Sequence, residues 1–191
     1  IMKKALTGFM VALSFLILSY PSFGQNAPPP EGGLLPKISL PVPGDDGYRK
    51  YLGLKGEGAF LIPQIKAKVV LIEIFSMYCP HCQKDAPVVN DLFSRIEDDG
   101  SLRENMKLIG IGVGNSDFEV DFFRKTYDIK FPLFSDGEFS AHKMLGEVRT
   151  PYFIAIKINK NGTHKVIYSK LGSVGDLDEF LKKIKNLAGL K

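Results

Sequence analysis

The chain has 191 residues, of which 45% are hydrophobic and 24% charged, and its formal net charge is +4 with an isoelectric point near 8.9. This length is sufficient for one domain with a hydrophobic core. The 25 basic residues are scattered among 21 acidic ones without forming a stripe, which argues against a nucleic-acid-binding protein.

Residues 1–24 have the form of a secretory signal peptide. Lys3 and Lys4 precede a mostly apolar run over residues 5–18, and small residues follow up to Gly24. This run is shorter than the roughly 20 residues that span a bilayer. We therefore predict cleavage of the segment and export to the periplasm, with an uncleaved membrane anchor as the alternative. Cleavage would remove Lys3 and Lys4 and leave a less basic mature protein.

Residues 25–36 follow without any hydrophobic periodicity. They contain three consecutive prolines from Pro28 to Pro30 and the pair Gly32-Gly33. Such a composition is typical of a flexible linker. The remaining residues, 37–191, are predicted to form a single domain.

The domain alternates strand and helix patterns along the chain. We predict a turn at residues 44–47, a helix cap at Asn115 or Ser116, and a hairpin turn at Asn161-Gly162. The helix that follows the cap is expected to bury Phe118, Phe122 and Phe123. This order predicts an α/β fold with a mixed sheet, helices on both faces, and parallel crossovers followed by one hairpin. The predicted strands are 37–42, 58–62, 69–76, 106–113, 131–134, 151–158 and 164–169, and the predicted helices are 83–96, 117–127, 136–145 and 173–188.

Cys79 and Cys82 are the only cysteines in the chain. They lie where the buried strand 69–76 turns into the helix 83–96. Free amide groups and the helix dipole at a helix N-terminus favour an anion, and they lower the pKa of a thiol there. A thiolate attacks disulfides, and a second thiol one turn further on can resolve the mixed disulfide. We therefore predict that Cys79 is the nucleophile and Cys82 the resolving thiol.

A structural disulfide is the alternative, because cysteines in exported proteins usually form bridges that stabilise the fold. A bridge between Cys79 and Cys82 would close a very small loop, and loop-entropy models give such loops the least stabilisation. The two residues between the cysteines also suit redox chemistry. Pro80 fits the first helical turn, and His81 can donate a hydrogen bond or a charge to the thiolate.

The segment from Glu73 to Cys82 resembles the active site of thioredoxin-fold thiol–disulfide oxidoreductases. Pro87 and the pair Thr150-Pro151 also match that superfamily, and the sequence Cys-Pro-His-Cys is the variant of DsbA-type oxidases. The two short strands before the core and the long interval from Cys82 to Pro151 resemble instead the TlpA/ResA-like branch, which carries an extra β-α unit there. The resemblance therefore implies a thioredoxin-like fold with a TlpA/ResA-like architecture.

The resemblance also implies roles for residues away from the two thiols. Glu73 would be a buried proton acceptor beneath Cys82; an edge or solvent-facing position is the alternative. Asp85 lies about where the TlpA/ResA branch carries an active-site acid; a solvated helix residue is the alternative. Thr150 would offer its backbone to an extended substrate strand, next to a cis Pro151.

These features predict a periplasmic thiol–disulfide oxidoreductase without cofactor or metal, acting as a monomer on protein thiols and disulfides. The resemblance to the TlpA/ResA-like branch implies a reductase supplied by a membrane redox partner and serving cytochrome c maturation. Stabilisation of a thiolate favours the alternative, a DsbA-like oxidase. A metal- or haem-handling chaperone that uses Cys79, Cys82 and His81 as ligands is an alternative of another class. A thiol peroxidase would need a Thr or Ser and an Arg beside its cysteine, and we found no such pattern before Cys79.

Overall fold

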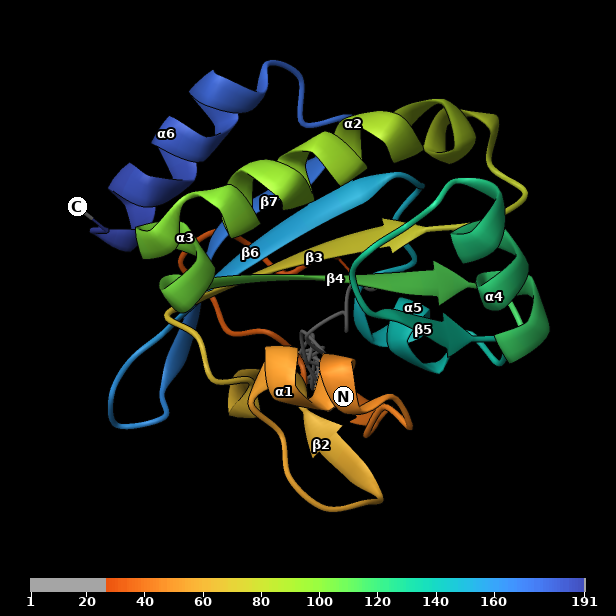
Figure 1. Ribbon diagram of the computed structural model, residues 1–191, viewed down its shortest axis with the longest axis horizontal. Helices are drawn as coiled ribbons and strands as arrows, with labels where there is room; N and C mark the ends of the chain where they lie inside the picture. The colour runs from red at the N-terminus through yellow and green to blue at the C-terminus, as the bar shows by residue number, and fades with distance from the viewer. Residues whose placement is uncertain (1–26, 191) are drawn as a thin grey trace, which may run out of the picture.

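A mixed five-stranded sheet organises residues 27–190, the part of the chain that the computed structural model describes (Figure 1). Its strand order is β5-β4-β3-β6-β7, with β3 at the centre. β3 runs parallel to β4 and antiparallel to β6, while β5 pairs parallel with β4 and β7 antiparallel with β6. The predicted mixed sheet is confirmed. Its strands are β3 (Val69–Phe75), β4 (Met106–Val113), β5 (Leu133–Asp136), β6 (Tyr152–Ile158) and β7 (His164–Leu171).

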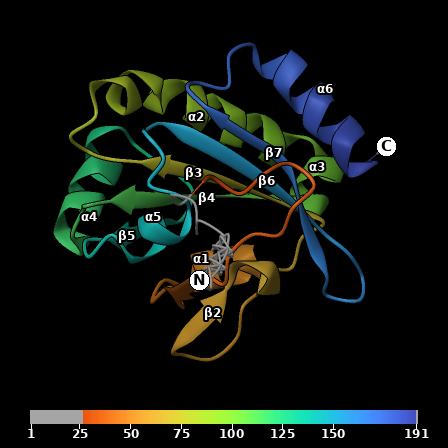
Figure 2. The same cartoon turned by 180° about the vertical axis from the view of Figure 1, so that it is seen from behind.

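Helices cover both faces of this sheet, because side chains alternate between the faces along each buried strand. Leu71 and Phe75 of β3 pack on the face that holds α2, whereas Ile72 and Ile74 pack on the opposite face. In Figure 1 the first face lies above the sheet and the second below it, and Figure 2 shows both from behind. The first face carries α2 (Pro80–Asp98), α3 (Gly100–Asn105), α4 (Asp117–Thr126) and α6 (Leu177–Ala188); the second carries α1 (Asp46–Leu52), α5 (Ser140–Met144) and the hairpin of β1 (Ser39–Pro41) with β2 (Ala59–Leu61).

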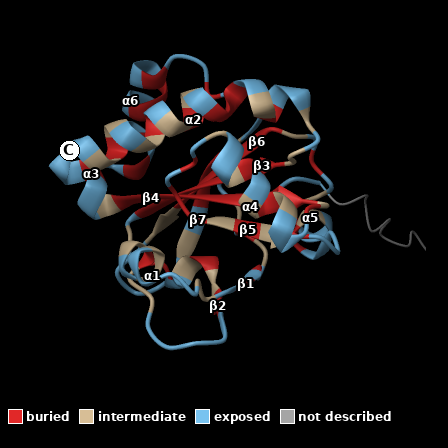
Figure 3. Cartoon of the chain, turned by 45° about the vertical axis from the view of Figure 1, so that its right-hand side comes forward, coloured by how far each residue is buried: buried red, intermediate tan, exposed pale blue. Residues whose placement is uncertain are grey.

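Strands β3 and β4 are buried along their whole length, as the red ribbons of Figure 3 show. Most of their side chains are aliphatic or aromatic. Glu73 on β3 is the exception that matters for function, because a carboxyl in a central strand loses its hydration. The strand therefore places one acid inside the apolar layer between the sheet and α2.

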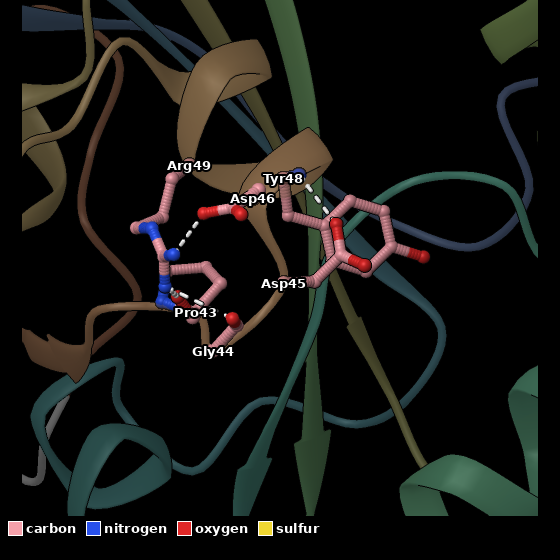
Figure 4. A network of polar contacts seen from close by, with 6 residues as sticks. All are labelled: Pro43, Gly44, Asp45, Asp46, Tyr48 and Arg49. Atoms are coloured by element: carbon pink, nitrogen blue, oxygen red, sulfur yellow. Dashed lines mark hydrogen bonds and ion pairs between the residues drawn. The ribbon is translucent and has the colours of Figure 1, made fainter.

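The sequence analysis missed helix α1, which begins where only a turn was predicted. Asp45 caps it by accepting a hydrogen bond of 2.8 Å from the Tyr48 amide (Figure 4). Arg49 then donates to the carbonyl oxygens of Pro43 and Gly44, at 2.9 Å each, and pairs with the Asp46 carboxylate. Two turns of helix are too short to show a clear period of 3.6 residues, so the pattern was not visible in the sequence.

Helix α3 was also missed, for a similar reason. The helix predicted over residues 83–96 ends at Asp98, as α2. The Asp99 carboxylate then accepts hydrogen bonds from the amides of Ser101 and Leu102, at 2.9 and 3.0 Å, and starts a new helix at once. Asp99 therefore both follows one helix and caps the next.

Several predicted boundaries were wrong by a few residues, among them the start of α2, which lies at Pro80 rather than at residue 83. Strand β5 begins at Leu133 rather than at residue 131, and its last residue, Asp136, was assigned to the following helix. The Asp136 carboxylate accepts hydrogen bonds from the amides of Ala141 and His142, which delays the start of α5 to Ser140. Helix α6 starts at Leu177 instead of residue 173, since Asp176 is its cap.

The predicted burial of α4 was correct for only one of its three phenylalanines. Phe123 packs in the core, whereas Phe118 and Phe122 are 78% and 52% exposed. Phe118 and Phe122 are four residues apart and share a face, while Val120 and Phe123 form the buried one. The predicted cap at Ser116 is confirmed, because its hydroxyl accepts a hydrogen bond from the Glu119 amide.

Residues 27–36 lie against the domain, so the predicted flexible linker is wrong for this stretch. Gly32 donates a backbone hydrogen bond of 2.8 Å to Val166 of β7, and Gly33 accepts one of 2.9 Å from the same residue. Leu35 is only 3% exposed, and its amide donates to Nε2 of His164 at 3.2 Å. The stretch therefore follows the free edge of β7 as a strap.

The predicted signal peptide over residues 1–24 lies outside the described residues. Among residues 27–190, the structure contains no helix with the length and apolar character that crossing a membrane requires. The signal peptide, its cleavage and the domain boundaries stay predictions.

Candidate active site

The turn between β3 and α2 presents Cys79 at the N-terminus of a 19-residue helix. Cys79 is the N-cap, its own amide donates to the Ser76 carbonyl at 3.0 Å, and Pro80 is the first helical residue. Cys79 is partly exposed and Cys82 is buried, and both are free thiols. The structure therefore gives the two sulfur atoms different access to solvent and to a partner.

The thiol of Cys79 is acidified by its surroundings. Burial by itself raises its pKa, but hydrogen bonds from the Thr150 side chain and from Cys82 and His81 outweigh that effect. The pKa of Cys79 is therefore lowered from its ordinary value. In the reduced form the Cys79 thiol donates to the Thr150 carbonyl oxygen, with Sγ and O 3.4 Å apart.

Cys82 is shifted in the opposite direction. Burial is the main reason that its pKa is raised, and the charge of Glu73 and the neighbouring Cys79 add to the effect. The Ser76 backbone partly offsets this rise. The pair therefore combines one thiol that ionises readily with one that holds its proton.

Glu73 lies in the apolar layer close to Cys82 and is 3% exposed. The alternative of an edge or solvent-facing position is therefore wrong. Burial, together with a smaller contribution from the charge of Asp85, raises the pKa of Glu73 to about 8. A carboxyl with this pKa can take up and release a proton near neutral pH.

Asp85 lies one turn after Cys82 and is also buried, so the alternative of a solvated helix residue is wrong. Its Oδ1 accepts a hydrogen bond from the Ser173 hydroxyl, which comes from the loop between β7 and α6. Its Oδ2 has no partner among the described residues. Burial raises the pKa of Asp85, and the hydrogen bond from Ser173 lowers it in part.

The loop before β6 faces the cysteines from the other side. Its Thr150-Pro151 peptide bond is cis, as the resemblance implied. Thr150 contacts Cys79 through its carbonyl, and His81 is exposed beside it on α2. All eight predicted site residues therefore come together around the start of α2: Glu73, Cys79, Pro80, His81, Cys82, Asp85, Thr150 and Pro151.

Asn115 is a site residue that the sequence analysis considered only as a helix cap. It is completely buried, and its Oδ1 accepts a hydrogen bond of 2.8 Å from the Met77 amide. Gln83 of α2 holds the same residue from the other side, because its amide group donates to the Met77 carbonyl at 2.7 Å. The loop that leads into Cys79 is thus fastened to both β4 and α2, through contacts up to 38 residues apart that no local pattern reveals.

A groove of about 660 Å³ is formed by α2, the cis-proline loop and the loop after β7. This size falls within the roughly 300–1,000 Å³ of typical ligand pockets. The groove is lined by Thr150, whose carbonyl contacts Cys79. Ser173, which holds Asp85, lies in its wall. The lining residues are His81, Lys84, Asp85, Val88, Arg149, Thr150, Pro151, Leu171, Gly172 and Ser173.

The described residues contain no group of three or more His, Cys, Asp or Glu side chains arranged to hold a metal ion. A thiol with a lowered pKa beside a thiol with a raised pKa, close to a buried acid, provides the groups that thiol–disulfide exchange requires. Together with the thioredoxin-like sheet, they define a thiol–disulfide oxidoreductase.

Comparison with known proteins identifies the family of the chain and its relatives. Residues 52–167 match the AhpC/TSA family, and the chain belongs to that family. It is 30% identical over 125 residues to thiol-disulfide oxidoreductase ResA of Bacillus thuringiensis, a match that covers 64% of this chain and 67% of the relative. The Bacillus cereus protein of the same name matches equally well. The expected TlpA/ResA-like relationship is confirmed.

Solved structures agree on the fold. A putative thiol:disulfide interchange protein DsbE from Chlorobium tepidum has a TM-score of 0.60 at 15% identity, with 84% of this chain and 99% of that chain covered. StoA from Bacillus subtilis has a TM-score of 0.51 at 19% identity, with 67% and 90% covered. At these identities the likeness supports the thioredoxin-like fold alone.

Proposed function

We propose that this protein is an exported reductase of protein disulfides, with Cys79 as the attacking and Cys82 as the resolving thiol. It acts in the periplasm, receives electrons from a membrane redox protein, and serves the maturation of cytochrome c. The relationship to the ResA proteins supports the enzyme class. Export is supported by the sequence of residues 1–24, together with the description of one structural relative from Mycobacterium tuberculosis as a secreted disulfide oxidoreductase.

The observation that supports the proposal best is that the two thiols differ in their exposure and in the direction of their pKa shifts. Cys79 is accessible, has a lowered pKa and touches the carbonyl of Thr150, whereas Cys82 is buried with a raised pKa. An accessible thiolate can attack a disulfide in another protein. A buried thiol cannot do so and reacts only after the mixed disulfide has formed beside it.

The reaction then proceeds in two exchanges. The Cys79 thiolate attacks one sulfur of a client disulfide, so the client S–S bond breaks and the second client sulfur leaves as a thiolate. Cys82 next loses its proton to the ionised fraction of Glu73 and attacks Cys79. A Cys79–Cys82 disulfide forms and the first client sulfur leaves, so two electrons have passed from the protein to its client. The membrane partner returns two electrons to restore both thiols.

The reduction potential of the Cys79–Cys82 pair tests the direction of this reaction. The protein would be equilibrated in glutathione or dithiothreitol buffers, and the free thiols counted by alkylation and mass. We expect a value of about −250 mV or below, as for a reductase. A potential near about −120 mV would instead identify a DsbA-like oxidase that donates its disulfide.

A Cys82→Ser variant separates exchange from binding. Without a resolving thiol, Cys79 should accumulate as a mixed disulfide with client proteins, and turnover should cease. A metal- or haem-handling chaperone would predict no trapped disulfide at all, and client maturation unchanged by loss of one thiol.

A thiol peroxidase is the second candidate function, because the structure supplies groups that we did not find in the sequence. Ser76, Arg149 and Thr150 line a cavity next to the loop that precedes Cys79, and a hydroxyl and a guanidinium are the groups such a site needs. Consumption of hydrogen peroxide by the reduced protein, at a rate far above that of free cysteine, would support this candidate. Exchange with protein disulfides but not with peroxide would eliminate it.

A further inference from the structure

We propose that the groove beside Cys79 selects client segments that carry an acidic side chain close to the reacting cysteine. This inference rests on the proposed function, because it concerns the substrates of the same site. The occupant that we propose for the groove is an extended segment of a client protein with a carboxylate within about two residues of its cysteine.

The charges that face the groove are mainly positive. Lys84 comes from α2 and Arg149 from the loop before β6, both are exposed, and both line the groove together with His81. Within residues 27–190, neither Lys84 nor Arg149 forms an ion pair with an acidic side chain. Their charges are therefore available to a bound molecule.

The one acid in the lining does not cancel this charge. Asp85 is buried, and its Oδ1 is engaged by the Ser173 hydroxyl. Burial also raises its pKa, which favours the neutral form. The groove therefore presents two permanent cations and a histidine to its occupant.

The shape of the groove suits a peptide. Val88, Pro151 and Leu171 give it an apolar part, and Leu171, at the end of strand β7, is 48% exposed. The Thr150 carbonyl lies at the Cys79 end of the groove and can accept a hydrogen bond from an extended chain. A client segment paired with this backbone would place alternate side chains toward Val88 and toward the cations.

Positive charge is more concentrated in this groove than in the neighbouring cavity that Ser76 and Tyr78 line. That cavity shares Arg149 but is otherwise lined by Tyr78, Phe139 and Glu147 among others. The Tyr78 hydroxyl there donates to the Glu119 carboxylate. A client therefore meets two cations in the groove and a mixed, partly acidic surface in the neighbouring cavity.

A set of three capped peptides tests the inference. They share one cysteine, held as a mixed disulfide with 2-mercaptoethanol, and differ only in carrying Asp, Asn or Lys on both sides of it. The rate constant for oxidation of the reduced protein by each peptide would be divided by the rate constant for dithiothreitol, which corrects for the intrinsic reactivity of the disulfide. We expect the Asp peptide to react roughly three- to tenfold faster than the Asn peptide, and the Lys peptide to be slowest. Added salt should reduce this preference.

Charge reversal provides the decisive control. The double variant Lys84→Glu, Arg149→Glu should favour the Lys peptide over the Asp peptide. A matched variant, Lys182→Glu with Lys185→Glu, changes the net charge equally but lies at a separate cavity beside α6, and it should keep the wild-type ratio. Equal corrected rates for the Asp and Asn peptides, or an unchanged preference after charge reversal, would overturn the inference. Failure of the wild-type protein to react with any of the peptides would instead contradict the proposed function.

Discussion

At the scale of single residues, the site places two buried acids near Cys82. Glu73 comes from β3 and Asp85 from α2, and each is less than a tenth exposed. Both pKa values are raised, mainly by burial, and the charge of Asp85 adds to the rise at Glu73. The pair can therefore hold a proton at neutral pH where one solvated carboxyl could not.

The buried position of Glu73 has a consequence for stability. In the unfolded chain it ionises near its ordinary pKa of 4.5, whereas the folded protein keeps it protonated up to about pH 8. Between these values the folded state binds more protons, so the free energy of unfolding should fall as pH rises from about 4.5 to 8. Each pKa unit is worth about 1.4 kcal/mol, so the total reaches a few kcal/mol.

A Glu73→Gln variant isolates this effect. We expect its stability to exceed that of the reduced wild-type protein by a margin that grows from pH 5 to pH 8, because glutamine has no proton to lose. Urea unfolding at pH 5, 6.5 and 8 measures the margin. A margin that stays constant across this range would show that Glu73 ionises normally in the folded protein.

At the scale of elements, the reactive turn depends on contacts between segments that are far apart in sequence. Asn115 follows β4, yet its side chain fixes the Met77 amide in the loop after β3. Gln83 ties the same loop to α2. Because Met77 is held through both its amide and its carbonyl, the N-terminus of α2 is kept in a fixed relation to the edge of the sheet.

An Asn115→Ala variant should loosen this turn. Loss of a partner for the Met77 amide is expected to lower the free energy of unfolding by about 1–3 kcal/mol. The pKa of Cys79 should also rise toward its ordinary value, because its hydrogen bonds are no longer aligned. Denaturant unfolding and the pH dependence of iodoacetamide alkylation measure the two effects.

Asn90→Ala is the matched control for this variant. The Asn90 side chain also holds backbone carbonyls, those of Tyr127 and Asp128, but it lies further along α2. It should reduce stability and leave the pKa of Cys79 unchanged. An equal change of that pKa in both variants would assign the effect to general destabilisation rather than to the turn.

At the scale of the whole molecule, the strap of residues 27–36 extends the domain beyond the thioredoxin-like core. It pairs with Val166 on the edge of β7 and buries Leu35 beside His164. An edge strand with free backbone groups is prone to pair with other chains, and the strap occupies part of this edge.

Deletion of residues 1–36 should therefore lower the free energy of unfolding, and deletion of residues 1–26 serves as the control. Burial of a leucine is worth about 2 kcal/mol and each hydrogen bond about 1 kcal/mol. We expect the longer deletion to lower the free energy of unfolding by roughly 2–4 kcal/mol relative to the shorter one. Identical unfolding curves for the two proteins would restore the interpretation of this stretch as a linker.

The order of the core elements and the position of the two thiols were predictable because they depend on local patterns. A β-branched run, a helical period and an Asn-Gly turn each act over a few residues, and Cys79 owes its place at a helix N-terminus to the boundary between two such patterns. Short capped helices such as α1 and α3 were not predictable, since two turns show no period.

The sequence by itself thus determined the thioredoxin-like order of elements and the spacing of Cys79 and Cys82. Only the tertiary structure decided that Glu73 and Asp85 are both buried, that Ser173 holds Asp85 across 88 residues, and that Lys84 and Arg149 meet in one groove. The physical reason is that the burial of a side chain and the charge around it depend on several segments of the chain at once. They arise only when helices and loops from distant parts of the chain pack on the same face of the sheet.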